Sequence, residues 1–411
     1  MSGFGLLGEH LSHSFSPAIH SLLGDYAYDL YETAPEELGS FLNETALEGM
    51  NVTIPYKKAV ISYCAELSPA AERIGSVNTL VRRENGWYGD NTDAYGFAFL
   101  LRRCGCDPEG KVCAVLGTGG ASATVQHVLR EQGAAKICVL SRSGRNDYAH
   151  LGDYADAEIV VNATPVGMYP KSGASPIAPS AFPACEYAID LIYNPLRTEF
   201  LQQMQQRSLQ EQQIVCENGL AMLVAQAARS AELFTGKSVP DSKIEEILCK
   251  LKADTESIAL IGMPGCGKTT VGRALAEQLG RPIVDLDEEI GEHTGISPEQ
   301  WIRAAGEDVF RAAETETLRT VSSRTGIVLA CGGGVVMRPE NLALLRQNSR
   351  IVWIERELCK LKTDGRPLSQ TGSLDAMYAL RKPLYEEFSD LRVQNDGSTE
   401  ETAKSILEAL K

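Results

Sequence analysis

The sequence predicts an α/β protein built from parallel sheets, and three observations lead to this prediction. Short apolar segments alternate with amphipathic ones, as where KVCAVLG is followed by ASATVQHVLREQG and then by AKICVLS. Such alternation is typical of βαβ units. Two glycine-rich stretches, starting at Gly117 and Gly262, each lie between an apolar segment and a helix-like one. The length of 411 residues exceeds the roughly 100–200 of one domain, so we expect two or three domains.

The composition is that of a globular protein rather than of a disordered or membrane-embedded chain. Hydrophobic residues make up 44% and charged residues 23% of the sequence. No apolar run approaches the ~20 residues of a membrane-spanning helix. The opening segment MSGFGLLGEHLSHSFSP lacks the basic region and the long apolar stretch of a signal peptide. These features predict a cytoplasmic protein that has no membrane partner.

The net charge and the cysteine content indicate which kinds of ligand and partner to expect. The net charge of −15 argues against a nucleic-acid partner, because phosphate backbones are bound by clustered Lys and Arg. Small anionic substrates remain compatible, since a few local arginines or helix N-termini hold them. The eleven cysteines form no CxxC pair, and Cys104 and Cys106 are spaced poorly for zinc. We therefore expect reduced thiols and no structural metal.

A domain boundary is predicted near residues 253–257. The amphipathic stretch Asp241 to Lys252 is followed by the short polar piece Ala253 to Ser257, and then by the new apolar strand Ile258 to Ile261. The Gln-rich stretch from Gln202 to Gln213 reads as the exposed face of a helix and the turn after it.

The first glycine-rich stretch predicts a dinucleotide site. The apolar strand Val112 to Leu116 runs into Gly117-Thr-Gly119-Gly120-Ala121 and then a helix, so backbone N–H groups face a pyrophosphate. The alternative is a tight βα turn without a ligand. At the end of the next strand, the segment Ser141-Arg142-Ser-Gly-Arg145 offers guanidinium groups instead of the acidic residue of an NAD site. NADP(H) is therefore preferred.

Polar clusters ahead of this unit predict a site for a polyhydroxylated substrate. They are Ser12 to Pro17, Asn51 to Lys57, Asn78-Thr79 and Asp90 to Asp93. Each cluster alone reads as a turn or a helix cap. Together they supply hydroxyls, amides, one lysine and one aspartate. Because ketone reduction needs a proton donor beside the hydride acceptor, Lys57 is the candidate donor and Asp93 the residue that holds it.

The second glycine-rich stretch predicts a nucleoside-triphosphate site. Gly262-Met-Pro-Gly265-Cys266-Gly267-Lys268-Thr269 satisfies the P-loop pattern between a strand and a helix. Its backbone N–H groups would cradle phosphates, Lys268 would reach the β and γ oxygens, and the Thr269 hydroxyl would ligate Mg²⁺.

Two carboxylates follow in the next strand. Asp285 and Asp287 stand at i and i+2, which predicts side chains on one face of a strand end, one for magnesium and one for a substrate hydroxyl. The alternative is a solvated acidic turn that continues into Glu288 and Glu289.

The N-terminal motifs resemble shikimate dehydrogenase, in order, over about residues 3–250. They are GLLGEHLSHSFSPAIHS, NVTIPYK, GSVNTL, GDNTDAYGF, GTGGAS, NATPVGM, DLIYNP and ENGLAMLVAQAA. The resemblance implies a split fold: residues 1–95 and 218–252 form a substrate-binding domain, and 96–217 form a Rossmann-type NADP domain. It also implies that Lys57 and Asp93 are catalytic and that the carboxylate of shikimate lies near Tyr193. The implied substrate contacts are Ser14, Ser16, Thr53, Lys57, Asn78, Asp93 and Gln226, and the implied NADP contacts are Gly117, Gly119, Gly120, Ala121, Ser141, Arg142, Arg145 and Ala221.

Two positions depart from that family pattern. The family usually has an Asn-Arg-Thr-x-x-Arg run at the 2′-phosphate, whereas this chain begins with Ser141 and brings Arg145 one residue closer. Ala221 stands where glycine is common, before the Met-Leu that packs on the nicotinamide. The selectivity for NADP over NAD depends on the first change.

The C-terminal motifs resemble shikimate kinase, a P-loop protein of the nucleoside-monophosphate-kinase-like group, over residues 257–411. Besides the P-loop and the Asp-Leu-Asp run they are GEDVFRAAE, CGGG, GRPL and RKPLY. The resemblance implies that Asp285 assists Mg²⁺ with Thr269, and that Arg366 reaches the ATP phosphates from a lid. The implied shikimate contacts are Asp287, Arg311, Gly333 and Arg381, with Asp287 and Lys268 catalytic, and the implied ATP contacts are Gly265, Cys266, Gly267, Lys268, Thr269, Thr270 and Arg366. A further lid arginine of the family has no clear counterpart among Cys359, Lys360 and Lys362.

The two halves point to one metabolite, which makes their reactions consecutive: 3-dehydroshikimate is reduced with NADPH, and shikimate is phosphorylated with ATP. One alternative is a quinate dehydrogenase joined to another small-polyol kinase, against which the Ser14 and Ser16 hydroxyl pair argues. Another is a ligand sensor that has lost catalysis, against which stand Lys57, Asp93 and Lys268.

Overall fold

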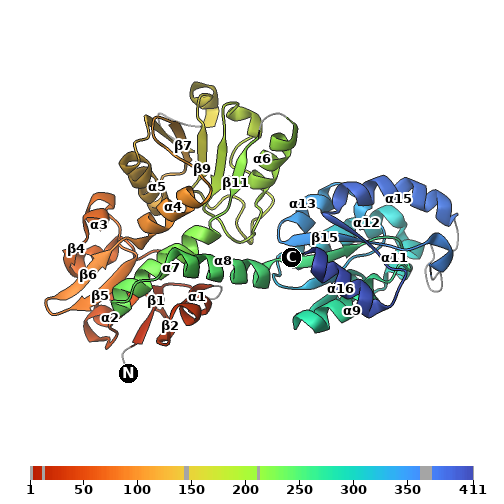
Figure 1. Ribbon diagram of the computed structural model, residues 1–411, viewed down its shortest axis with the longest axis horizontal. Coiled ribbons are helices and arrows are strands. Elements are labelled where there is room, and N and C mark those ends of the chain that lie inside the picture. Colours follow the sequence, from red (N-terminus) through yellow and green to blue (C-terminus); the bar gives the residue numbers. More distant parts are fainter. Residues whose placement is uncertain (1–2, 12–13, 143–147, 211–212, 362–372, 411) are drawn as a thin grey trace. The chain divides into compact units, whose positions relative to one another are not determined.

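The computed structural model describes residues 3–410 except 12–13, 143–147, 211–212 and 362–372 (Figure 1). The chain divides into two compact units. The first comprises Met1–Met168, Ala174–Tyr193 and Gln203–Lys250, and the second Tyr169–Gly173, Asn194–Gln202 and Leu251–Lys411. The division at residue 250 falls inside α8 (Asp241–Thr255), which extends to Thr255, into the polar piece Ala253 to Ser257 that was expected to follow the helix.

A six-stranded sheet in the order β2-β1-β3-β5-β6-β4 begins the first unit. β5 pairs antiparallel with β3 and β6, while the remaining pairs are parallel. Leu7, Met50 and Leu80 are fully buried on it and belong to one apolar core. Its elements are β1 (Gly3–Gly8), α1 (Ser16–Leu23), β2 (Ala27–Glu32), α2 (Leu38–Glu44), β3 (Gly49–Val52), β4 (Cys64–Leu67), α3 (Pro69–Ile74), β5 (Thr79–Arg83) and β6 (Gly86–Asp90).

A second sheet of the first unit is fully parallel, in the order β11-β10-β9-β7-β8. In Figure 1, α4 and α5 lie on one side of this sheet and α6 on the other. The predicted strand Val112 to Leu116 is β7, and the Gln-rich stretch lies largely in α6. The elements are α4 (Thr92–Arg103), β7 (Val112–Leu116), α5 (Gly120–Glu131), β8 (Lys136–Leu140), β9 (Ile159–Asn162), β10 (Tyr187–Asp190), α6 (Glu199–Gln210) and β11 (Val215–Glu217).

Helix α7 (Leu220–Thr235) returns to pack along α4, and Gly96 on α4 makes this packing close. A side chain at Gly96 would place its Cβ 2.5 Å from the Met222 carbonyl oxygen and 3.0 Å from Gln226 Cβ. The absence of a side chain there lets α7 bring Gln226 next to Asn78, which precedes β5, and to Thr92, which begins α4. The packing therefore joins residues more than a hundred positions apart in one site.

The second unit has a parallel sheet in the order β13-β14-β12-β15-β16, covered by helices on both faces (Figure 1). Trp353 on β15 and Tyr385 on α15 are among its largest buried side chains. Ser398 and Glu401 cap α16 reciprocally, which fixes where that helix begins. The elements are β12 (Ser257–Ile261), α9 (Lys268–Leu279), β13 (Ile283–Asp285), α10 (Leu286–Thr294), α11 (Pro298–Ala305), α12 (Glu307–Val321), β14 (Val328–Ala330), α13 (Glu340–Arg346), β15 (Ser349–Glu355), α15 (Leu374–Phe388), β16 (Leu391–Gln394) and α16 (Thr399–Ala409).

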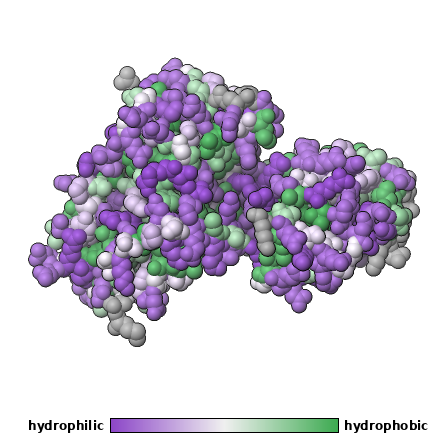
Figure 2. All heavy atoms as spheres, viewed as in Figure 1, coloured by the Kyte–Doolittle hydropathy of each residue, from purple (hydrophilic) through white to green (hydrophobic). Residues whose placement is uncertain are grey.

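The surface seen in Figure 2 is predominantly hydrophilic, with hydrophobic residues showing as small separate areas. None of the helices in the described part of the chain combines the length and the apolar character needed to cross a membrane.

Candidate active sites

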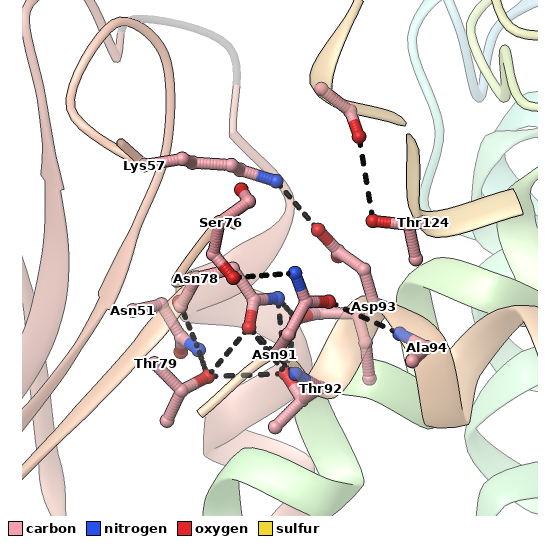
Figure 3. Close-up of polar contacts among 12 residues, drawn as sticks. Asn51, Lys57, Ser76, Asn78, Thr79, Asn91, Thr92, Asp93, Ala94 and Thr124 are labelled. Carbon is pink, nitrogen blue, oxygen red and sulfur yellow. Dashed lines mark hydrogen bonds and ion pairs between the residues drawn. The ribbon is translucent and has the colours of Figure 1, made fainter. Parts of the chain in front are cut away.

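A lysine–aspartate pair forms the first candidate site. The Lys57 ammonium nitrogen lies 2.6 Å from Asp93 Oδ2, and the two side chains are 27% and 15% exposed (Figure 3). Lys57 follows β3, and its backbone carbonyl is held by the Val77 N–H. Asp93 stands in the first turn of α4, which begins at the cap residue Asn91. Local structure on both sides therefore fixes a charged pair that water and a small ligand still reach.

The amides of Asn78 and Gln226 lie beside this pair. Asn78 Oδ1 accepts a hydrogen bond from the Thr92 N–H at 2.7 Å, and its Nδ2 donates to Thr92 Oγ1 at 3.1 Å. Gln226 Oε1 lies 3.5 Å from Asn78 Nδ2. Both residues are more than nine-tenths buried, so their amide groups have fixed orientations. The structure thus brings together Lys57, Asp93, Asn78 and Gln226, four of the residues that the family resemblance implies for the substrate site.

Behind these amides lies a set of buried polar residues, of which Asn51, Thr79 and Thr92 belong to the predicted polar clusters and Ser230 was not assigned to the site. Ser230 Oγ lies 2.7 Å from Asn51 Nδ2, 3.0 Å from Thr79 Oγ1 and 3.1 Å from Thr92 Oγ1. Asn51 and Thr79 are inside recognised motifs, whereas Ser230 stands one helical turn after Gln226 on α7. That spacing was the available signal for Ser230, because residues four apart share a helix face.

The buried His20 supports the same network from the opposite side. Its ring stacks on Tyr28 with centroids 3.8 Å apart, and its Nδ1 lies 2.7 Å from the Tyr26 hydroxyl. Tyr28 in turn donates to Asn51 Oδ1 at 2.7 Å. Burial is the main cause that lowers the pKa of His20 from 6.5 to about 3, while a hydrogen bond with Asn51 opposes it. His20 is therefore a neutral ring at physiological pH.

The remaining predicted substrate residues lie on neighbouring segments. Ser16 is buried in the first turn of α1, and its N–H donates to Ser14 Oγ at 3.2 Å. Thr53 follows β3 directly, and its N–H donates to the Leu7 carbonyl. The Tyr193 ring lies 5.5 Å from that of Phe15, and burial raises the pKa of its hydroxyl.

The predicted dinucleotide turn joins β7 to α5. Gly117 has φ +106°, and a side chain there would come within 2.9 Å of Thr164 Cγ2, so this turn requires glycine. Side chains at Gly119 and Gly120 would meet nothing within 4 Å, which leaves the N-terminus of α5 open to a pyrophosphate. The geometry of this turn is therefore compatible with a bound NADP pyrophosphate.

The predicted clamp for the 2′-phosphate is described in part. Ser141 and the exposed Arg142 follow β8, and Arg145 lies outside the described residues. Ala221 is 1% exposed at the start of α7, so its methyl group is covered by protein atoms.

The P-loop joins β12 to α9 and carries Lys268 in an inward position. Gly267 precedes the helix with φ +102°. The Lys268 ammonium donates to the carbonyls of Gly262 at 2.9 Å and of Met263 at 3.0 Å, and the residue is 8% exposed. Thr269 Oγ1 donates to Asp285 Oδ2 at 2.7 Å. A hydroxyl next to a carboxylate is an oxygen donor set that suits Mg²⁺.

The prediction that Asp285 and Asp287 share a strand face is wrong for Asp287. β13 ends at Asp285, whose side chain caps α10 by accepting from the Asp287 N–H at 3.0 Å. The cap turns the backbone, and Asp287 lies in the first helical turn instead. Both carboxylates nevertheless line the same cavity.

That cavity has a volume of about 600 Å³, and most of the residues predicted for the kinase site line it. Arg381 Nη1 donates to the Gly333 carbonyl at 3.0 Å, and Tyr385 donates to the same oxygen at 2.6 Å. Predicted residues that line the cavity are Gly265, Gly267, Lys268, Thr269, Thr270, Asp285, Asp287, Arg311, Gly333 and Arg381. Cys266 is buried below the loop, and Arg366 lies outside the described residues.

Arg311 is held by two glutamates. Its Nη1 lies 2.8 Å from Glu314 Oε2 and its Nη2 lies 2.9 Å from Glu307 Oε1. Burial raises the pKa of Glu314, which lines the cavity and is fully buried, and the positive charge of Arg311 opposes that shift. Glu314 was visible in the GEDVFRAAE motif, but its burial beside Arg311 was not.

Comparisons with known families agree with this geometry. The family model for shikimate kinase matches residues 264–411. The model for the shikimate dehydrogenase substrate binding domain matches residues 6–80, and that for the shikimate 5'-dehydrogenase C-terminal domain matches residues 219–249. The shikimate dehydrogenase (NADP(+)) of Clostridium perfringens is 33% identical over 273 residues, covering 61% of this chain and 99% of the relative. That of Clostridium beijerinckii is 36% identical over 253 residues, covering 57% of this chain and 92% of the relative.

Solved structures resemble the first part of the chain in the same way. A chorismate mutase/shikimate 5-dehydrogenase fusion protein from Clostridium acetobutylicum matches with TM-score 0.57 and 36% identity, over 61% of this chain and 97% of its own. Shikimate 5-dehydrogenase from Thermus thermophilus, in complex with NADP(H) and shikimate, matches with TM-score 0.55 and 34% identity, over 61% and 99%. The chain therefore belongs to the shikimate dehydrogenase family and continues into a shikimate kinase domain, as the motifs of its two halves indicated.

Proposed function

We propose that this chain catalyses two consecutive reactions: reduction of 3-dehydroshikimate to shikimate with NADPH, and phosphorylation of shikimate to shikimate 3-phosphate with ATP and Mg²⁺. The observation that carries the proposal is that its two parts match families whose names refer to one metabolite, and that each part holds a site of the required chemistry. When bound, NADPH supplies hydride to the first reaction and Mg-ATP supplies the phosphoryl group to the second.

In the first reaction Lys57 is the proton donor. Its ammonium, 2.6 Å from Asp93 and still partly exposed, protonates the carbonyl oxygen as that oxygen gains negative charge. Asp93 keeps the ammonium in place. The fixed amides of Asn78 and Gln226 bind substrate hydroxyls, with Ser14, Ser16, Thr53 and Tyr193 completing the site.

The open turn at Gly117, Gly119 and Gly120 holds the pyrophosphate of NADP. Ala121 is the second residue of α5, and Ser141 and Arg142 follow β8. These two residues would bind the 2′-phosphate, and the family resemblance adds Arg145, which lies outside the described residues. Ala221, buried at the start of α7, would lie near the nicotinamide, as the family resemblance implies.

In the second reaction the cavity at the P-loop holds both substrates. Arg311 and Arg381 bind the carboxylate of shikimate, and Asp287 orients the hydroxyl that attacks. Lys268 would exchange its bonds to the loop carbonyls for the β and γ phosphates, and Thr269 and Asp285 would hold Mg²⁺. Gly265, Cys266, Gly267 and Thr270 would form the phosphate cradle, and the family resemblance assigns Arg366, which lies outside the described residues, to the ATP phosphates.

The domains that carry these reactions follow the sheets. Residues 1–95 with 218–252 form the substrate domain of the dehydrogenase, 96–217 the NADP domain and 257–411 the kinase. The three sheets, whose strands run within residues 3–90, 112–217 and 257–394, support this division. We place the protein in the cytoplasm, and support comes from its eleven free cysteines, which suit a reducing compartment.

A staged assay on the full chain tests the proposal. NADPH absorbance is followed with 3-dehydroshikimate, and Mg-ATP is then added while ADP is measured. We expect absorbance to fall first and ADP to appear only once shikimate has formed. Faster turnover of quinate than of shikimate would reassign the first substrate. A folded protein that binds both nucleotides but shows neither signal would refute the catalytic proposal.

A further inference from the structure

Asn395 contacts the P-loop from the end of β16, the edge strand that pairs with β15. It follows β16 directly, is 6% exposed and lines the same cavity as Gly267 and Lys268. Its Nδ2 donates to the Cys266 carbonyl oxygen at 2.7 Å. Asn395 therefore bonds to the loop at the peptide that immediately precedes Gly267.

The orientation of the Asn395 amide is determined by its partners. A backbone carbonyl only accepts, so the amino group must face Cys266. The other end, Oδ1, lies 2.9 Å from the Thr402 hydroxyl, which can donate to it. The Asn395 N–H also donates to the Glu355 carbonyl at 2.8 Å, which anchors its backbone to the end of β15. Two contacts, with Thr402 and with Glu355, thus hold Asn395 in addition to its bond to the loop.

This bond has a direct consequence for the phosphate cradle. The Cys266–Gly267 peptide is trans, so its C=O and N–H point in opposite directions. With the carbonyl bonded to Asn395, the Gly267 N–H points away from Asn395. A side chain at Gly267 would place its Cβ 2.5 Å from Asn395 Nδ2, so glycine at this position lets the loop and Asn395 approach each other closely. P-loops bind phosphate through such outward N–H groups.

We propose that Asn395 is a positioning residue of the ATP site, which holds the Cys266–Gly267 peptide with its N–H directed at the phosphates. The proposal rests on the kinase function proposed above. It predicts that Asn395 governs the affinity for Mg-ATP and leaves the affinity for shikimate unchanged. Asn395 does not react and does not replace Lys268 or Thr269.

The test measures Mg-ATP in two ways on the full chain: the KM in the kinase assay, and the Kd by calorimetry without shikimate. Asn395→Asp has nearly the same shape but sets a carboxylate oxygen against the Cys266 carbonyl. We expect KM and Kd for Mg-ATP to rise about 10- to 100-fold, the cost of one misplaced buried hydrogen bond. Thr402→Val, which frees the amide without removing it, should show a smaller rise in the same direction.

Two controls separate this role from general damage. Asp396→Asn changes the next residue, which is exposed and pairs with Lys360 at 3.4 Å, and should leave KM for Mg-ATP at the wild-type value. The dehydrogenase activity of each variant reports on the integrity of the chain. Unchanged Kd for Mg-ATP in Asn395→Asp, or equal increases in the KM values of both substrates, would overturn the proposal. Because Kd is measured without shikimate, a wild-type chain that binds Mg-ATP without phosphorylating shikimate refutes the kinase function and not this inference.

Discussion

The two lysines proposed for chemistry are held in different ways. Lys57 in the first unit is already paired with its aspartate at 2.6 Å and is 27% exposed at the side chain. Lys268 in the second unit is 8% exposed and bonds to carbonyls of its own loop. Arg311, also in the second unit, forms ion pairs with Glu307 and Glu314.

This difference follows from the chemistry that each site performs. A proton donor must stand in a fixed place before the ketone arrives, and an aspartate can hold it there permanently. Lys268 has no anionic partner among the described residues until the nucleotide binds. Its ammonium therefore bonds to the carbonyls of Gly262 and Met263, and the phosphates would replace these bonds. We infer that the first site is assembled in advance and that the second exchanges internal contacts for those with its substrates.

Replacing Lys57 should have the largest effect. Lys57→Ala removes the proton donor, and the kcat of the dehydrogenase should fall about 10²- to 10⁴-fold. Phosphorylation of added shikimate should remain at the wild-type rate. Lys58→Ala, which alters the exposed neighbouring lysine, is the matched control. Equal loss of both activities would point to a folding defect instead of a catalytic role.

Replacing Lys268 should have the reverse outcome with a somewhat smaller loss. Lys268→Ala removes one charged contact to the transferred phosphoryl group, and kinase kcat should fall about 10²- to 10³-fold. NADPH oxidation should be unaffected. The control is Arg273→Ala on the same helix, whose exposed side chain lies 3.5 Å from Glu288. Retention of kinase activity in Lys268→Ala would contradict the exchange of contacts inferred for this site.

Acid should affect the first unit more than the second through His20. Its folded pKa of about 3 lies below the ordinary 6.5, so between these values the unfolded chain binds a proton that the folded chain does not. Stability is therefore lost as pH falls below about 6.5, by up to about 1.4 kcal/mol per pH unit. The only histidine of the C-terminal half, His293, is exposed.

The measurement is the urea midpoint for loss of each activity after incubation at pH 7, 6 and 5. The dehydrogenase midpoint should fall more steeply than that of the kinase, and His20→Gln should flatten its pH dependence. Parallel midpoints for the wild-type chain and for His20→Gln would show that His20 titrates normally.

The smallest effect concerns the internal partner of Arg311. Glu307 is 42% exposed, so its ion pair contributes at most about 1 kcal/mol. Glu307→Gln should make Arg311 easier to transfer to the substrate carboxylate, and KM for shikimate should fall about two- to fivefold. Glu316→Gln, on the same helix and 76% exposed, is the control. An unchanged or higher KM would show that Arg311 needs no release.

Local patterns predicted much of the fold and of the sites. The strands Val112 to Leu116 and Ile258 to Ile261 and the amphipathic stretch after Asp241 were found where expected. These predictions succeeded because periodicity and glycine-rich turns act over a few residues. The prediction for Asp287 was wrong because Asp285 caps α10. The strand therefore ends at Asp285, two residues earlier than expected.

The order of residues was sufficient to predict the α/β class, the two glycine-rich turns, the families of both halves and the candidate residues of both sites. Which side chains bond to one another became clear only from the packing. Ser230 meets Asn51 from 179 residues away, and Asn395 reaches Cys266 from 129 residues away. Such contacts depend on how helices and strands pack, and packing joins residues whose spacing in the chain carries no signal of their proximity.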